Sequence, residues 1–100
     1  MTTTEIKEEE RILLKVEGRV DTTNATDFQN AILLSLQKMN NLVIDLSQLE
    51  YVSSAGLRAF LLGHKTAASK GGSLTIVGVN DAVRAIFKTT GFDKFLTIEG

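Results

Sequence analysis

The feature that most constrains the fold is an alternation between short apolar runs and longer stretches of helical spacing. Residues 42–46 (LVIDL) form a nearly continuous apolar run, as expected for a strand covered on both faces. The preceding stretch, residues 22–40, instead repeats apolar residues every three or four positions, which predicts an amphipathic helix. Strands that alternate with crossover helices form a parallel sheet. The chain is therefore expected to be an α/β protein.

The same patterns predict the element order β-β-α-β-α-β-α-β. We expect one mixed, mostly parallel sheet of about five strands, in which the first strand is antiparallel because its turn is short. We expect a single domain over residues 1–100. The predicted strands are residues 6–8, 12–17, 42–46, 74–77 and 95–98. The predicted helices are residues 22–40, 55–69 and 81–90.

Glycines and small polar residues predict where these elements end. Gly18 is expected to end the second strand, and the pair 71–72 (Gly-Gly) to end the second helix. Thr23 or Asn24 can cap the first helix, while Asn80 caps the third, which Gly91 ends. The apolar stripes predicted for the first two helices are Ala25, Phe28, Ile32, Leu36 and Met39, and Leu57, Phe60, Leu61, His64 and Ala68.

Charge and composition exclude several classes of function. The 11 basic and 12 acidic residues give a formal net charge of −1, so neither a nucleic acid nor an anionic membrane is an expected partner. Without cysteine there is no thiol catalysis, and the single His64 argues against structural zinc, so we expect no metal and no cofactor. No apolar stretch reaches the ~18 residues of a membrane span, and the N-terminus lacks signal-peptide regions. We expect a cytoplasmic protein without membrane insertion.

Two adjacent hydroxyls, Ser53 and Ser54, lie between the central apolar run and the second helix. Functional groups of open α/β sheets gather beyond the carboxyl ends of the strands, so this junction is the expected site. Three roles are open for Ser54. It can cap the helix by accepting a hydrogen bond from the amide of Gly56 or Leu57, or act as a nucleophile. It can also accept a phosphate, which the free amides and the helix dipole would favour.

The enzyme alternatives lack supporting residues. A nucleophile elbow has the form G-x-S-x-G, but Val52 stands two positions before Ser54. His64 falls on the predicted apolar stripe, where a packed, hydrogen-bonded histidine is expected rather than a base. Neither G-x-x-x-x-G-K-[ST] nor G-x-G-x-x-G occurs, and residues 78–80 (GVN) are a weak phosphate signal. We expect no catalytic residue and a protein that is not an enzyme.

Residues 42–57 (LVIDLSQLEYVSSAGL) resemble the signature of STAS domains, specifically of bacterial anti-sigma factor antagonists. Residues 17–21 (EGRVD) and 89–93 (TTGFD) support the resemblance. It implies a protein that binds an anti-sigma factor, itself a serine kinase, and thereby frees a sigma factor. It also implies that this kinase phosphorylates the antagonist, which ends binding, and that a PP2C-type phosphatase restores it. Matched to the motif, the acceptor is Ser54, with Ser53 as the rival.

Two residues depart from the family pattern. Ser53 stands where the family often has aspartate before the acceptor, and Ala55 stands where it often has Ser or Thr. The resemblance also implies an alternative function, because some STAS proteins are subunits of ABC lipid-transport complexes. Others belong to anion transporters or stress-signalling assemblies. These binding modules need no phosphoserine cycle.

The resemblance places the partner on the second helix. The predicted contacts include Ser53, Ser54 and Gly56 at the start of this helix. The spacing i, i+4, i+7 and i+11 predicts one exposed face further along it. Its members are Arg58, Leu62, Lys65 and Ser69. Leu62 is the apolar residue among polar neighbours, and Arg58 is a charge close to Ser54. We expect Leu62 to be a contact residue, although single exposed leucines are also common on surfaces without partners.

Overall fold

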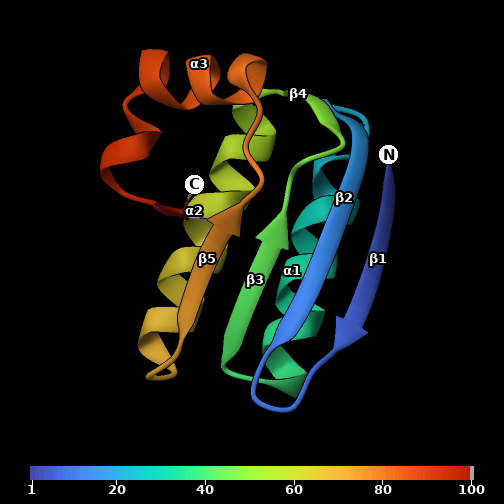
Figure 1. The fold of residues 1–100 in the computed structure, drawn as a ribbon, viewed down its shortest axis with the longest axis vertical. Coiled ribbons are helices and arrows are strands. Elements are labelled where there is room, and N and C mark those ends of the chain that lie inside the picture. Colours follow the sequence, from blue (N-terminus) through green and yellow to red (C-terminus); the bar gives the residue numbers. More distant parts are fainter. Residues whose placement is uncertain (100) are drawn as a thin grey trace.

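A computed structural model describes residues 1–99 as a mixed six-stranded sheet with helices packed on one face (Figure 1). Strands β1, β2, β3, β5 and β6 lie side by side in that order, and β4 pairs with β2. Only β1 is antiparallel to its neighbour. The strands are β1 (Thr2–Lys7), β2 (Ile12–Val20), β3 (Asn41–Asp45), β4 (Leu49–Val52), β5 (Ser73–Val77) and β6 (Thr97–Glu99). The helices are α1 (Ala25–Lys38), α2 (Ser54–Ser69), α3 (Asp81–Thr90) and the short 3-10 helix η1 (Phe92–Lys94). The predicted fold class is confirmed.

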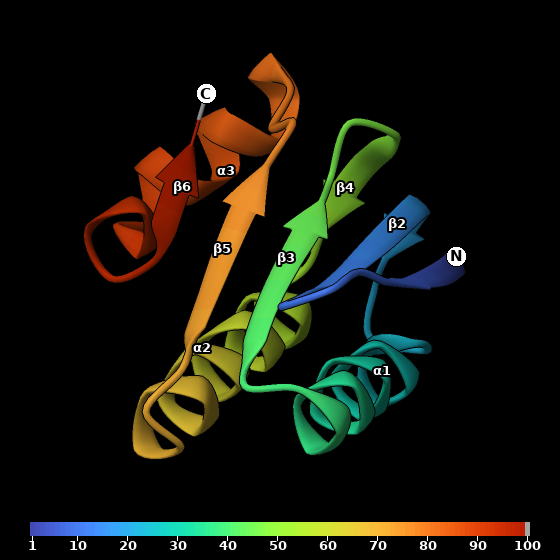
Figure 2. The same ribbon diagram turned by 60° about the horizontal axis from the view of Figure 1, so that its bottom comes forward.

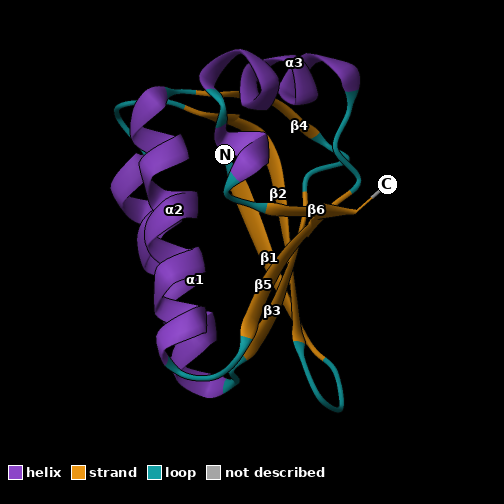
Figure 3. Ribbon diagram, turned by 90° about the vertical axis from the view of Figure 1, so that its left-hand side faces the viewer, coloured by secondary structure: helices purple, strands orange, loops and turns teal. Residues whose placement is uncertain are grey.

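The helices α1 and α2 both lie against one face of the sheet, and α3 crosses beyond the carboxyl ends of the strands (Figure 3). The view in Figure 2 shows α1 and α2 side by side beneath β2, β3 and β5. The opposite face of the sheet carries no helix among residues 1–99. The start of α2 therefore lies at the end of the sheet where β4 and α3 also meet.

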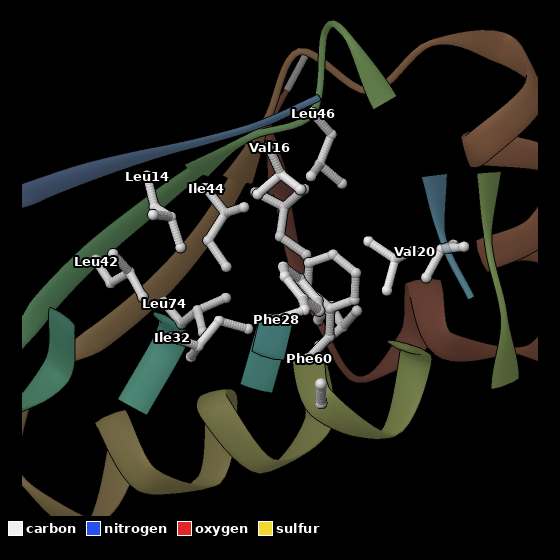
Figure 4. Close-up of a cluster of buried hydrophobic side chains, with 14 of the residues drawn as sticks. Leu14, Val16, Val20, Phe28, Ile32, Leu42, Ile44, Leu46, Phe60 and Leu74 are labelled. Atoms are coloured by element: carbon white, nitrogen blue, oxygen red, sulfur yellow. The ribbon is translucent and has the colours of Figure 1, made fainter. Parts of the chain in front are cut away.

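The core fills the space between the sheet and these helices. Inward-facing residues of the strands, such as Leu14 and Ile44, meet Phe28 of α1 and Phe60 of α2 (Figure 4). The Phe28 and Phe60 rings meet edge to face with centroids 4.9 Å apart, and Phe60 meets Phe87 of α3 at 5.6 Å. Such pairs add about 0.5–1.5 kcal/mol each beyond the burial of their area. Phe60 thus joins all three helices to one core.

Strand β4 was not predicted, and the end of β2 was predicted wrongly. Gly18 does not end β2 but marks an irregularity within it, at a φ of +92° that favours glycine. Before this point β2 pairs with β3, and after it Arg19 and Val20 pair with Tyr51 and Val52 of β4. The glycine lets one strand change partner and reach the start of α2. The final strand also begins later than predicted, at Thr97, because the Phe95 and Leu96 amides both donate to Phe92 O and turn the chain there.

The buried face of α2 differs from the predicted stripe. Leu57 and Phe60 are buried as expected, but His64 and Leu61 are half-buried and Ala68 is exposed. The remaining buried positions of the helix are Gly56, Ala59, Gly63 and Ala67. A Cβ added to Gly63 would lie 2.6 Å from Ile32 Cγ2 of α1 and 2.8 Å from Leu74 Cδ1 of β5. Small residues therefore allow α2 to pack closely, a property that hydrophobic spacing does not detect.

Several predicted helix ends agree with the structure. Asn80 caps α3 by accepting a hydrogen bond from the Val83 amide at 2.9 Å, and Gly91 ends this helix in the left-handed region. Gly71 ends α2 in the same way, and the Gly72 amide donates to Ala67 O. Asn24 occupies the capping position of α1, but its side chain instead bonds the Asp21 amide and Arg19 O.

Candidate functional site at the start of helix α2

Ser53, not Ser54, is the cap of α2. Its backbone is extended, with a φ of −81° and a ψ of 172°, and its Oγ accepts a hydrogen bond from the Gly56 amide at 3.2 Å. The Ser53 amide donates to Val20 O of β2 at 2.8 Å, and its carbonyl accepts from Leu57. The residue is only 9% exposed. The prediction that Ser54 caps the helix is therefore wrong, because the helix begins one residue earlier than that assignment required.

Ser54 is the first residue of α2, and it is exposed. Its hydroxyl has no hydrogen bond within residues 1–99. The first turn of a helix also has free amides and the positive end of the helix dipole, so an anion here is stabilised. The two adjacent serines thus differ physically. Ser53 is engaged in the fold, and Ser54 faces solvent.

Strand β4 and helix α3 support this junction. The Asn80 side chain caps α3 with its Oδ1 and, through its Nδ2, donates to Leu49 O of β4 at 2.6 Å. One residue therefore fastens the start of α3 to the strand that leads into Ser53. The sequence predicted the cap but not this second bond, because the bond depends on the unpredicted strand β4.

Arg19 and Tyr51 form a second contact beside the junction. The Arg19 guanidinium carbon lies 4.6 Å from the centre of the Tyr51 ring, a cation–π geometry. Nearby, the Thr23 hydroxyl, followed by the Thr23 amide, lowers the pKa of Asp21 below its usual range. The Arg19 contact was not predicted from the sequence. It depends on the register of β2 with β4, in which Arg19 and Tyr51 are direct partners.

Gly56 is buried beneath the start of the helix. A Cβ added there would lie 2.6 Å from Val52 Cγ2 and 2.8 Å from Val20 Cγ1. Glycine at this position therefore lets α2 approach β2 and β4 closely. Gly56 and Ser53 were both predicted to contact a partner, and that role stays a prediction. Their observed role is to hold the helix start in place.

The remaining predicted contact residues lie together on the surface. Arg58, Leu62, Lys65 and Ser69 are all exposed along the outer face of α2, and Leu62 is 38% exposed. The spacing rule therefore grouped these residues correctly on one face. Whether a partner binds them stays a prediction.

The histidine base that a nucleophilic serine commonly uses is not close to Ser54. The single histidine, His64, lies ten residues further along α2, or about 15 Å of helical rise, too far for a hydrogen bond with Ser54. Its Nδ1 is buried and has no hydrogen-bond partner among residues 1–99, so the expected hydrogen-bonded histidine is not observed. Two surface hollows of about 260 and 180 Å³ are lined by outer-face residues such as Thr75 and Lys15 and do not include either serine.

Two further features, a metal site and a membrane-spanning helix, are absent from residues 1–99. No group of three or more histidine, cysteine or carboxylate side chains is arranged to hold a metal ion there. Within the same residues, no helix has the length and apolar character needed to cross a membrane.

Comparison with known proteins identifies the family. The family model described as "Mlab, STAS domain" matches residues 3–98. The chain belongs to the STAS domain family. The protein BtrV of Bordetella bronchiseptica, named as an anti-sigma factor antagonist, is 33% identical to this STAS domain over 78 residues. That match covers 77% of this chain and 67% of BtrV.

Two solved structures share the architecture of this STAS domain. An anti-sigma factor antagonist from Mycobacterium paratuberculosis superposes with a TM-score of 0.86 at 26% identity, over 97% of this chain and 83% of that one. The antagonist TM1081 from Thermotoga maritima gives a TM-score of 0.87 at 22% identity, over 96% and 84% of the two chains. The resemblance to anti-sigma factor antagonists is thereby confirmed. These relatives are named for regulation and not for a reaction.

Proposed function

We propose that this STAS domain is an anti-sigma factor antagonist that binds a serine-kinase anti-sigma factor and is switched off by phosphorylation of Ser54. The observation that carries the proposal is the division of roles between the two serines. Because Ser53 caps α2 and Ser54 is exposed, a phosphate on Ser54 leaves the cap intact. The helix dipole and the free amides of the first turn favour the added negative charge.

The chemistry is a phosphoryl transfer from ATP held by the kinase. Ser54 Oγ forms a bond to the γ-phosphorus, the bond between that phosphorus and the β–γ bridging oxygen breaks, and ADP leaves. The hydroxyl proton passes to a base of the kinase. The phosphate adds about −1.5 to −2 charges at the partner surface. A PP2C-type phosphatase hydrolyses the phosphoserine and restores binding.

The test uses variants that isolate each hydroxyl. Asp is also a good helix cap, so Ser53→Asp keeps the helix start while leaving Ser54 as the single hydroxyl of the pair, and it supplies the aspartate that the family often has there. After incubation with the kinase and ATP, peptide mass mapping should find phosphate on Ser54 in the parent and in Ser53→Asp, and none in Ser54→Ala. Phosphate on Ser53, or an unmodified parent, would refute the proposal.

A second candidate function is a binding subunit of an ABC lipid-transport complex. It is favoured by Ser53, which stands where the antagonists often have aspartate before the acceptor, because a binding subunit needs no phosphoserine cycle. In this role Ser54 stays unmodified, and the domain copurifies with an ATP-binding subunit and a permease. Purification from the native cell, followed by mass spectrometry of the bound proteins, distinguishes the two functions.

A further inference from the structure

The exposed face of α2 forms one narrow stripe that begins at Ser54. At 100° per residue, its members fall within an arc of about 80° around the helix axis. All of them are exposed in the structure. We call this set the α2 stripe: Ser54, Arg58, Leu62, Lys65 and Ser69.

The α2 stripe is basic, and its charges are unpaired. Helix α2 contains no Asp or Glu, and Arg58 and Lys65 lie on the stripe on either side of Leu62. Neither cation forms an ion pair or a side-chain hydrogen bond within residues 1–99. By contrast, Lys38 on α1 is paired with Glu5 at 2.6 Å. The stripe therefore presents two free cations around an apolar side chain, on a chain of net charge −1.

We propose that the α2 stripe binds an acidic protein surface around Leu62, and that phosphate on Ser54 ends this binding by pairing with Arg58 within the same helix. This inference rests on the proposed function and specifies its partner and its switch. Opposite charges across an interface give specificity and speed association, while a central apolar residue supplies affinity. An acidic partner with an apolar pocket complements the stripe in both respects.

The spacing along the helix selects Arg58 as the partner of the phosphate. Residues at i and i+4 are neighbours on a helix surface, and Arg58 lies about 6 Å along the axis from Ser54. Arginine also suits phosphate because its planar guanidinium can donate two parallel hydrogen bonds. Lys65 lies about 16 Å along the axis, beyond the screening length of about 8 Å at physiological ionic strength. The phosphate would therefore make Arg58 unavailable to the partner. It would also change the charge at the start of the α2 stripe from positive to negative.

An anionic membrane is the other surface that a basic stripe could meet. Helices that bind membranes need a broad apolar face, whereas the α2 stripe exposes a single large apolar residue, Leu62. We therefore assign the stripe to a protein, and treat membrane binding as an outcome that the test can detect.

The first experiment measures the intramolecular pair without any partner. Phosphoserine is incorporated at position 54, and its second pKa is followed by phosphorus NMR in the parent, Arg58→Gln and Lys65→Gln. A nearby guanidinium favours the dianion, so the pKa should be lower in the parent than in Arg58→Gln. The more distant Lys65→Gln should match the parent. Equal values in all three proteins would overturn the proposed pairing.

The second experiment tests the acidic partner. Unphosphorylated protein is titrated into the serine-kinase anti-sigma factor of the same genome at low and high salt. Arg58→Gln and Lys65→Gln should each weaken binding about two- to fivefold and reduce its salt dependence. Lys15→Gln, on the open face of the sheet, is the matched control and should bind like the parent.

The outcomes separate this inference from the proposed function. If binding is tight and is weakened neither by salt nor by either stripe variant, the partner surface is not acidic. The antagonist function would still hold in that case. A parent that does not bind the kinase would overturn both. Vesicles containing phosphatidylglycerol form the third arm, and binding to them in place of the kinase would assign the stripe to a membrane and refute the proposal.

Discussion

The buried and exposed faces of helix α2 differ in the side chains that they carry. The buried face is built largely from glycine and alanine, and at Gly56 and Gly63 a single added carbon would meet neighbouring atoms at 2.6–2.8 Å. The outer face instead carries long side chains, with Arg58 and Lys65 unpaired. On one helix, glycine and alanine therefore allow close packing around the anchoring ring of Phe60, while charged side chains on the other face stay exposed.

The largest effect is expected where the buried face is enlarged. Gly63→Leu would force a side chain between Ile32 and Leu74, where even a Cβ would be too close, so it should lower the free energy of unfolding by about 3 kcal/mol. Ala68→Leu makes a similar enlargement at an exposed position of the same helix, and should change it by less than about 0.5 kcal/mol. Urea unfolding measures both. Equal stability of the two variants would contradict the close packing of α2.

A change on the outer face should affect binding instead of folding. Leu62→Glu should weaken the complex with the anti-sigma factor by about 2 kcal/mol, as expected for an apolar anchor, and leave the unfolding midpoint unchanged. Leu34→Glu is the matched control, because Leu34 is 54% exposed but lies on α1. Calorimetric titration of both variants decides the matter. If Leu62→Glu binds like the parent, Leu62 is an exposed leucine without a partner.

The helix start should show a smaller difference in stability. Ser53→Ala removes the hydroxyl that accepts from the Gly56 amide, and should cost about 1 kcal/mol of unfolding free energy. Ser54→Ala removes an exposed hydroxyl and should stay within about 0.5 kcal/mol of the parent. Thermal melting compares them. A greater loss in Ser54→Ala would mean that the cap is misassigned.

The smallest effect on stability is expected when the ion pair between Lys38 and Glu5 is removed. The Lys38 ammonium, followed by the Ser35 hydroxyl, lowers the pKa of Glu5. Since the folded pKa lies below the unfolded one, this stabilisation is present above the unfolded pKa and is lost as pH falls through the folded pKa.

The measurement is the free energy of unfolding as a function of pH. Glu5→Gln should lose up to about 1 kcal/mol at neutral pH and reduce the decline in acid. Arg58→Gln, which removes an unpaired cation, should keep the profile of the parent. An acid decline that is unaffected by Glu5→Gln would show that the Glu5 pair is not a source of the pH dependence.

Local signals predicted much of the fold. The apolar run at residues 42–46 and the helical spacing before it are properties of neighbouring residues, and both elements formed as expected. The ends of α3 at Asn80 and Gly91 were likewise predictable, because capping depends on one or two residues.

Features that depend on distant residues were not predictable. Strand β4 has only four residues, and it forms where β2 changes partner after Gly18. From the sequence alone, this glycine predicts the end of a strand. The buried face of α2 was misjudged at His64 and Ala68, because close packing favours glycine over apolar size. The two serines lie at the predicted junction between strand and helix, but which of them caps the helix depends on where β4 ends.

The most direct test of the account compares one added carboxylate at two adjacent positions. Ser53→Asp and Ser54→Asp carry the same charge at the start of α2, and both should melt near the parent because Asp suits a helix start. Affinity for the anti-sigma factor is then measured by calorimetry. We expect Ser54→Asp to lose binding, whereas Ser53→Asp, with its carboxylate in the cap, should retain most of it. Equal affinities for the two variants, or loss of binding together with loss of the melting transition in Ser54→Asp, would contradict it.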